Sequence, residues 1–196
     1  MRFEFNNPTR IVFGAGSLSR LGEFASRYGK RALVVTGGGS VKRSGTFAQA
    51  VKSLKEAGVS VYECAGVEPN PRITSVRRGA ETARQNGCEM VIAIGGGSVM
   101  DASKVMAAAA LYHGDPWDMI LHGQEKVHIP TEALPIITVP TLAATGSETN
   151  CGAVITNQET QEKSFVMAES LYPKVALLDP RVDDERPEGP DGVRRM

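Results

Sequence analysis

Short apolar runs alternate with segments of helical period along most of this chain. The apolar runs occupy residues 11–13, 31–36, 59–62, 90–94 and 136–139. Between them, apolar side chains recur at every third or fourth position in residues 17–24, 46–57, 73–86 and 99–112. Glycines at positions 58 and 87 end two of these helical segments. The pattern predicts strands that alternate with helices.

The predicted strands are apolar on both faces, which is typical of a parallel sheet that is covered on each side. We therefore expect a doubly wound α/β domain with helices on both faces of the sheet. Right-handed crossovers then bring every loop that follows a strand to the same edge of the sheet. Residues 177–180 end a further buried strand, and residues 113–131 are expected to form a long connection.

The composition is that of an ordinary globular protein. With 196 residues, of which 41% are apolar and 22% charged, the chain can bury one good core. Its formal net charge is zero, so charge gives no support to the binding of nucleic acid or a membrane surface. Three scattered cysteines without CxxC spacing predict reduced thiols. We expect neither a secretory signal nor a membrane span, and hence a cytoplasmic location.

A glycine-rich loop that follows a buried strand carries the strongest local signal, in the stretch VIAIGGGSVMDASK (91–104). Without Cβ atoms, the glycine backbone can approach a ligand closely. The free N–H groups and the dipole of the next helix suit a phosphate, and Ser98 adds a hydroxyl. Asp101 and Lys104 lie three residues apart on that helix, where they can interact. A tight turn with ordinary capping is the alternative interpretation.

The stretch VTGGGSVKRSG (35–45) places a second glycine-rich loop after an earlier core strand. In dinucleotide-binding folds, an acid after the second strand often binds the ribose hydroxyls, whereas small or basic residues admit a 2′-phosphate. This loop holds no acid, and its candidate cofactor contacts are Gly37, Gly38, Ser40 and Lys42. Its composition favours NADP over NAD, although a solvated basic loop would have the same residues.

A cluster of hydroxyls follows the last core strand, in the stretch TVPTLAATGSETN (138–150). Short hydroxyl side chains at a strand end, among them Thr138, Thr141 and Thr145, suit hydrogen bonds to a cofactor. When the stretch is taken alone, a polar loop with capping hydroxyls is the favoured interpretation. The three histidines of the chain share no helical face and predict no metal site.

Taken together and in order, five motifs resemble those of the iron-containing alcohol dehydrogenases, in the branch of butanol dehydrogenases and broad aldehyde reductases. They are FGAGSLSRL (13–21), GGGSVKRSG (37–45), PNPRI (69–73), AIGGGSVMDASK (93–104) and TVPTLAATGSETN (138–150). The resemblance implies a dinucleotide-binding domain over residues 1–180, with the fold of a dehydroquinate synthase-like N-terminal domain. It also implies an NADP- or NAD-dependent oxidoreductase that acts on a small-molecule alcohol or aldehyde.

The resemblance also assigns residues to parts of the cofactor. The pyrophosphate region would be held by Gly96, Gly97, Ser98 and Asp101. The rest of the dinucleotide cleft would be lined by Asn70, Thr141, Leu142, Thr145 and Lys163. Gly38, Ser40 and Lys163 would favour the 2′-phosphate.

Members of this family carry Fe²⁺ or Zn²⁺ on an Asp and three His of a second, all-helical domain. None of those ligands has a counterpart in this sequence, so we expect no catalytic residue and no metal ligand in it. The chain would then be inactive alone, and a homodimer is a possible assembly. Two alternatives stay open, a non-catalytic dinucleotide-binding remnant and a domain of the glycerol-dehydrogenase type.

The segment 181–196 does not match the family and is rich in acidic residues. After back-translation, a shift of one base near the codons of Pro180 and Arg181 gives a run that resembles the family continuation. We therefore expect a frameshift at this point. A genuine, solvated acidic tail is the alternative.

Overall fold

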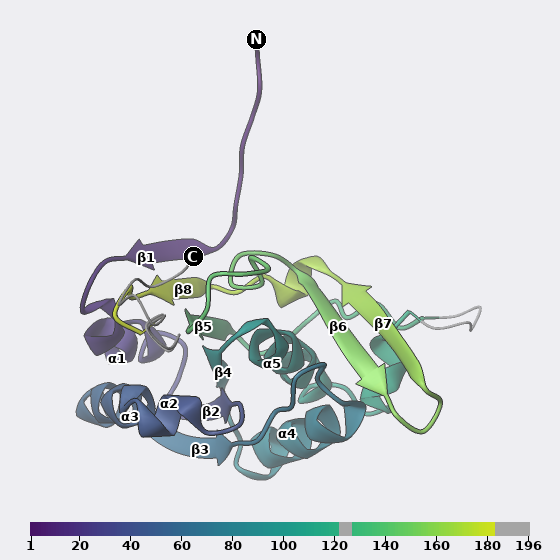
Figure 1. The fold of residues 1–196 in the computed structure, drawn as a ribbon. Helices are drawn as coiled ribbons and strands as arrows, with labels where there is room; N and C mark the ends of the chain where they lie inside the picture. The colour runs from purple at the N-terminus through teal and green to yellow at the C-terminus, as the bar shows by residue number, and fades with distance from the viewer. Residues whose placement is uncertain (122–126, 183–196) are drawn as a thin grey trace, which may run out of the picture.

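Six parallel strands form the centre of the structure, a computed structural model that describes residues 1–121 and 127–182 (Figure 1). Across the sheet the strands follow the order β1 (Arg10–Phe13), β8 (Val175–Leu178), β5 (Ile136–Pro140), β4 (Met90–Gly95), β2 (Arg31–Thr36) and β3 (Ser60–Cys64). Every neighbouring pair is parallel. The predicted doubly wound α/β class is therefore confirmed.

The most apolar runs occupy the middle of this sheet. Every residue of β4 and of β5 is buried, and so are the five residues of β2 that follow Arg31. Such strands need cover on both faces, which the crossover helices supply. The edge strand β1 differs, because Ile11 and Phe13 are exposed.

Helices cover both faces of the sheet and enclose two separate core clusters (Figure 1). One face carries η1 (Ser17–Arg20), α1 (Leu21–Ala25), α2 (Ser40–Arg43) and α3 (Thr46–Glu56). The other carries α4 (Ile73–Gln85), α5 (Gly97–Ala109), η2 (Pro116–Met119) and η3 (Glu169–Leu171). The alternation of side chains along each strand divides the two clusters; in β2, for example, Leu33 faces α4 and α5, whereas Val34 faces α1 and α3.

Gly22 lets α1 and α3 pack closely. A Cβ atom at this position would overlap the backbone carbonyl of Ser53 on α3. The Gly22 N–H also donates to Ser53 Oγ at 2.9 Å, and this hydroxyl donates to the Ser19 carbonyl at 2.7 Å. The contact fixes the helical layer on this face of the sheet.

A separate antiparallel hairpin, β6 (Gly152–Asn157) and β7 (Glu162–Met167), was not predicted from the sequence. In β6, buried and more exposed residues alternate, so no continuous apolar run marks the strand. Its inner side chains Ala153 and Ile155 join the cluster beneath α5. In Figure 1 the hairpin lies on the outer side of α5, so that this helix separates it from the sheet.

The predicted boundary at residue 180 stays a prediction, because residues 183–196 lie outside the described part. Two residues of the predicted tail are described: Arg181 is exposed, whereas Val182 is buried in the cluster beneath α1. Asp179 joins this end of β8 to η1, since its carboxylate accepts from the Leu18 N–H at 3.2 Å and the Arg181 N–H at 3.1 Å. Within the described residues, no helix has the length and apolar character to span a membrane.

Candidate functional site

The strand order creates a crevice between the loops that follow β2 and β4. From β2 the chain moves outward to β3, then returns to the opposite side of β2 to form β4. The loops after β2 and β4 therefore diverge at the carboxyl edge of the sheet. In open α/β sheets, ligands bind at such a switch point.

Two glycines, which have no Cβ atom, allow α5 to start close to this crevice. A Cβ atom at Gly95 would lie 2.6 Å from Val99 Cγ2, and one at Gly97 would lie 2.9 Å from Thr145 Oγ1. Helix α5 therefore begins directly at the end of β4 and against the segment that follows β5. Its first turn points backbone N–H groups, which have no partner within the helix, toward the cleft.

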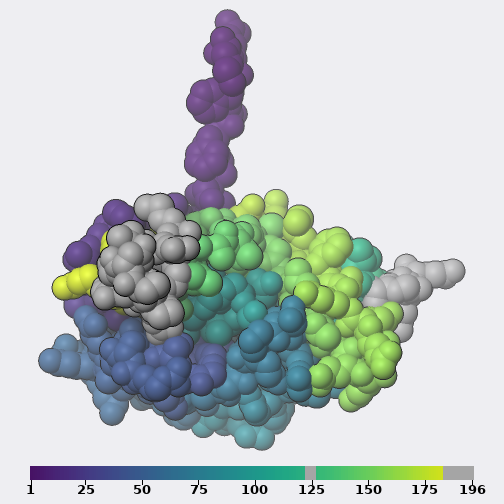
Figure 2. Space-filling view, viewed as in Figure 1, coloured from purple at the N-terminus to yellow at the C-terminus, as the bar shows by residue number. Residues whose placement is uncertain are grey.

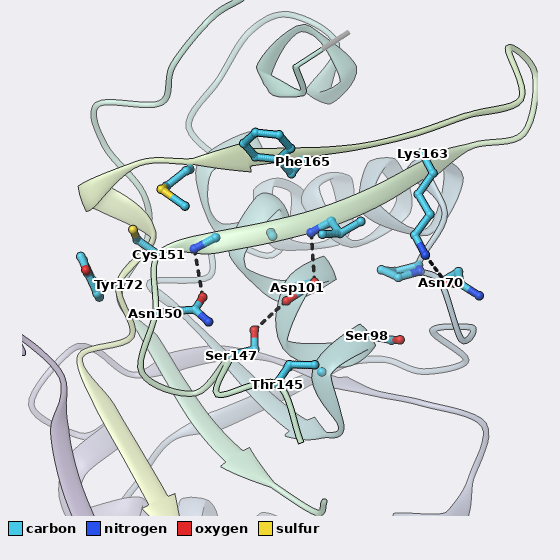
Figure 3. A pocket seen from close by; sticks show the side chains of 16 residues that line it. Asn70, Ser98, Asp101, Thr145, Ser147, Asn150, Cys151, Lys163, Phe165 and Tyr172 are labelled. Atoms are coloured by element: carbon cyan, nitrogen blue, oxygen red, sulfur yellow. Dashed lines mark hydrogen bonds between the residues drawn. The ribbon is translucent and has the colours of Figure 1, made fainter. Parts of the chain in front are cut away.

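Beside this helix start lies an open cleft of about 830 Å³ (Figure 3). Six residues predicted from the sequence line it: Asn70, Gly97, Ser98, Asp101, Thr145 and Lys163. They come from the loop after β3, the first turns of α5, the segment after β5 and strand β7. The structure thus brings together residues that lie up to 93 positions apart.

The unpredicted hairpin forms one wall of the cleft and adds apolar surface to it. Val154 of β6 and Phe165 and Met167 of β7 line the cleft, and all three are exposed. Figure 3 shows the Phe165 ring on the hairpin above Asp101 and Ser147. The sequence did not mark these positions, because Val154, Phe165 and Met167 are apolar residues on the exposed side of a hairpin whose inner side packs on α5.

Lys163 and Asn70 join the hairpin to the loop after β3. The Lys163 ammonium donates to Asn70 Oδ1 at 2.7 Å, and both side chains line the cleft. Asn70 has a φ of 55°, a left-handed conformation that asparagine tolerates better than most residues. The Thr156 N–H donates to the Pro71 carbonyl at 2.8 Å and strengthens the same junction.

Asp101 uses its carboxylate to shape the cleft. Its Oδ1 accepts from the Ser147 hydroxyl at 2.6 Å, and its Oδ2 accepts from the Val154 N–H at 3.0 Å. The carboxylate therefore joins α5 to both the segment after β5 and to β6. Both oxygens are engaged within the protein, so the role of Asp101 beside a pyrophosphate would be to hold the surrounding backbone in place.

Lys104 lies behind the cleft and has no exposed surface. Its ammonium donates to Ser147 Oγ and Asn150 Oδ1, each at 2.9 Å, and to the Gly152 carbonyl at 2.8 Å. Burial, which disfavours the charged form, lowers the pKa of Lys104 to about 8. The sequence indicated only that Lys104 lies near Asp101; the two side chains meet through Ser147.

The loop after β2 lies outside the residues that line the large cleft. Gly38 is exposed, Gly37 and Ser40 are half-buried, and Lys42 forms an ion pair of 2.5 Å with Glu63 of β3. Glu63 offsets the charge of Lys42, which weakens the case for Lys42 as a phosphate ligand.

The other predicted residues are not among those that line the large cleft. Gly96, at the N-cap of α5, has open space around the position of a Cβ atom. The Thr141 N–H donates to the Gly95 carbonyl at 3.2 Å, and Leu142 lines a separate apolar hollow of about 230 Å³. Thr138 is fully buried, and its hydroxyl bonds the Glu148 and Val175 carbonyls at 3.4 Å each. The structure therefore does not bring Thr138 to the cleft.

The described residues do not fit an iron or zinc ion. Across residues 1–121 and 127–182, no group of three or more His, Cys, Asp or Glu side chains could hold a metal. His122 falls outside these ranges.

The parallel sheet, its switch point and the helix start at the cleft define an α/β domain of the nucleotide-binding class. Residues 8–180 match the family model of the iron-containing alcohol dehydrogenases. The chain belongs to this family, as its motifs predicted.

The relatives include enzymes named for both nicotinamide cofactors. A probable NADH-dependent butanol dehydrogenase of Bacillus subtilis is 48% identical over 178 residues, which are 91% of this chain and 45% of that protein. The NADPH-dependent aldehyde reductase YqhD of Escherichia coli is 39% identical over 180 residues, which are 91% of this chain and 45% of that protein.

The crystal structure of NADH-dependent butanol dehydrogenase A from Thermotoga maritima superposes with a TM-score of 0.88 at 44% identity. The match covers 95% of this chain and 46% of that one. The chain therefore spans just under half the length of the relatives that it matches.

We expect Asp101→Ala to lower the free energy of unfolding by about 2–4 kcal/mol, because it leaves the Val154 N–H and the Ser147 hydroxyl without their acceptor. Equilibrium urea unfolding measures the change. Glu162→Ala, which removes an exposed acid from β7, is the matched control and should change it by less than about 0.5 kcal/mol. Equal unfolding free energies for the two variants would contradict this role for Asp101.

Proposed function

We propose that this chain is the dinucleotide-binding domain of an NAD(P)-dependent oxidoreductase. One observation carries the proposal: the glycine-rich start of α5, which follows β4 at the switch point of the sheet, borders a large cleft. Backbone N–H groups and the helix dipole attract a phosphate there without any side-chain charge. Membership in the iron-containing alcohol dehydrogenase family supports the same conclusion.

The cleft offers each chemical part of a dinucleotide a matching surface. The pyrophosphate would lie at the N–H groups of Gly97 and Ser98, with the Lys163 ammonium as the nearby cation. Beyond it, the exposed Phe165 and Met167 give an apolar wall for a flat ring. A bound nicotinamide ring would supply the hydride chemistry, and these residues would hold and orient it.

At the adenosine end we propose that the loop after β2 admits NADP as well as NAD. Gly38 is exposed, and the loop from Gly37 to Ser40 carries no acid to repel a 2′-phosphate. Relatives with related sequences are named for NADH in one case and NADPH in another, so both cofactors belong in the test.

Gly38→Asp is expected to weaken NADPH binding about tenfold and to leave NADH binding within about twofold, because the new carboxylate would face the 2′-phosphate. The site suits this test, since a Cβ atom at Gly38 meets no atom within 4 Å. Titration of the reduced nucleotides, followed by their fluorescence, gives both dissociation constants. Gly38→Asn controls for size. An equal loss for the two nucleotides, or no loss for either, would place the 2′-phosphate elsewhere.

For the whole protein we propose the oxidation of a small alcohol or the reduction of an aldehyde, as the names of the relatives suggest. The 196-residue chain itself should bind nucleotide without turning over such a substrate, since its described residues hold no metal-binding group. The absorbance of the reduced nicotinamide, with butanol or butyraldehyde and added Fe²⁺ or Zn²⁺, measures turnover. Sustained turnover by the purified chain would overturn this expectation. Binding without turnover is also what the remnant alternative requires.

We further infer that the chain self-associates as a homodimer, through β1 and the arm formed by residues 1–9. Residues 1–6 of the arm are exposed and the arm's end stands clear of the body in Figure 2, and Phe3, Phe5, Ile11 and Phe13 are 81%, 80%, 54% and 73% exposed. β1 is an edge strand whose outer side has no partner among the described strands. An apolar, open edge of this kind favours association.

The free thiols of all three cysteines support a cytoplasmic location.

Sedimentation velocity should show a dimer for the parent chain and a shift toward monomer for Phe13→Glu, because a charge on the edge strand opposes strand pairing. Lys52→Glu, on the exposed face of α3, is the control for an added acid and should sediment as the parent does. A monomeric parent chain at concentrations near 100 µM, on the order of those used for weak dimers, would contradict the inferred dimer.

A further inference from the structure

We propose that Lys104 is a positioning residue for the dinucleotide: its ammonium holds the segment 147–152, and through Ser147 the Asp101 carboxylate, in the arrangement that forms the cleft beside α5. The inference rests on the proposed function, since it concerns how the same cleft is kept in shape.

The geometry around Lys104 uses every donor of the ammonium. The three N–H bonds meet three acceptors, Ser147 Oγ, Asn150 Oδ1 and the Gly152 carbonyl, at 2.8–2.9 Å. All three acceptors belong to one short segment, and all three of these residues line the cleft. Lys104 does not reach the cleft, because it is 0% exposed. It can therefore act on a ligand only through the residues that it holds.

A single chain of hydrogen bonds extends this effect to the hairpin. Ser147 accepts from Lys104 and donates to Asp101 at 2.6 Å, and Asp101 accepts from the Val154 N–H at 3.0 Å. The positive and negative groups thus lie on either side of one hydroxyl. Asn150 Oδ1 also accepts from the Gly152 N–H at 3.0 Å, which closes the turn into β6. The loss of the ammonium would release both ends of the segment.

Stability alone does not account for a charged group at this place. Well-packed apolar residues often replace buried charges with no loss of stability, whereas charges fix a particular arrangement of partners. The charged and titratable groups that face Lys104 are Asp101 on α5, and Glu148 and Cys151 on the segment. These groups favour the ammonium, but desolvation outweighs them and brings the pKa of Lys104 to about 8. A neutral amine has two donors, so one of the three acceptors would then lose its partner.

The lowered pKa of Lys104 fixes the direction in which pH acts on the segment. An unfolded lysine, with a pKa near 10.5, binds a proton more readily than the folded one, with a pKa of about 8. Between those pH values the unfolded state holds more protons, so linkage from Lys104 raises the free energy of unfolding as pH increases. The same sign holds for a local opening that returns Lys104 to water, so loss of its proton favours the closed arrangement of residues 147–152.

The first experiment uses the thiol of Cys151, which lies between two residues held by Lys104. Parent, Lys104→Met and Lys52→Met chains are labelled with iodoacetamide at about pH 6.5 and about pH 9.5, on either side of the Lys104 pKa. Peptide mapping separates Cys151 from the buried Cys64 and Cys88. At the lower pH we expect Lys104→Met to label Cys151 roughly tenfold faster than the parent, and at the higher pH the ratio should be larger, because linkage from Lys104 favours the closed segment in the parent alone. Lys52→Met should match the parent at both.

Nucleotide binding is measured on the same three proteins. Lys104→Met should weaken NADH and NADPH alike by roughly tenfold at the lower pH, since it loosens the cleft without touching either cofactor. A folded Lys104→Met chain with parent-like dissociation constants, or with a labelling ratio that is the same at both pH values, overturns the positioning role. If the parent binds neither nucleotide, the proposed function fails, while the labelling ratio still decides whether Lys104 holds the segment.

Should Lys104→Met fail to fold, hydrogen exchange in the parent chain gives the answer. The amide exchange rate of residues 147–154 is divided by the amide exchange rate of α3, so that the intrinsic dependence of exchange on pH cancels. We expect this ratio to fall above about pH 8, because loss of the Lys104 proton opposes an opening that returns this side chain to water. A ratio that stays flat across this range overturns the proposal.

Discussion

The close approach of α5 to the end of β4 is the constraint on which the cleft depends. No side chain fits at Gly95 without overlapping Val99, and none fits at Gly97 without crowding Thr145. Because both positions are glycine, the helix begins where the strand ends, and its N-terminus faces the crevice at the switch point. A helix that began one turn later would withdraw its N–H groups from the cleft and leave the hairpin without its support.

The polar residues around α5 divide into those that face the cleft and those that hold it. Ser98 and Lys163 present groups to the cleft, whereas Asp101 uses both carboxylate oxygens inside the protein. Lys104 lies one turn further along α5, where it is fully buried and belongs to the residues that hold the cleft. A phosphate at the helix start would therefore meet backbone dipoles and the Lys163 ammonium, and the charges of Asp101 and Lys104 would lie behind it.

Sequence patterns predicted the sheet and the start of α5 because each depends on neighbours along the chain. Continuous apolar runs at β2, β4 and β5 require a covered parallel sheet, and three glycines between a strand and a helix require a close turn. The hairpin escaped prediction because its burial depends on α5, which lies about 50 residues earlier. Thr138 shows the same limit: its strand was predicted, but nothing local indicated that its hydroxyl would point to the Val175 carbonyl. The pairing of Lys42 with Glu63 likewise depends on β3.

Amide NMR spectra of the 196-residue chain during titration with NADPH show whether the nucleotide binds at the start of α5. We expect the largest shift changes at residues 96–101 and at Asn70 and Lys163, with saturation at one nucleotide per chain. Changes confined to residues away from the cleft, such as the hollow around Tyr112 and His128, would contradict it. So would a spectrum that millimolar NADPH, on the order of the weakest specific binding, leaves unchanged.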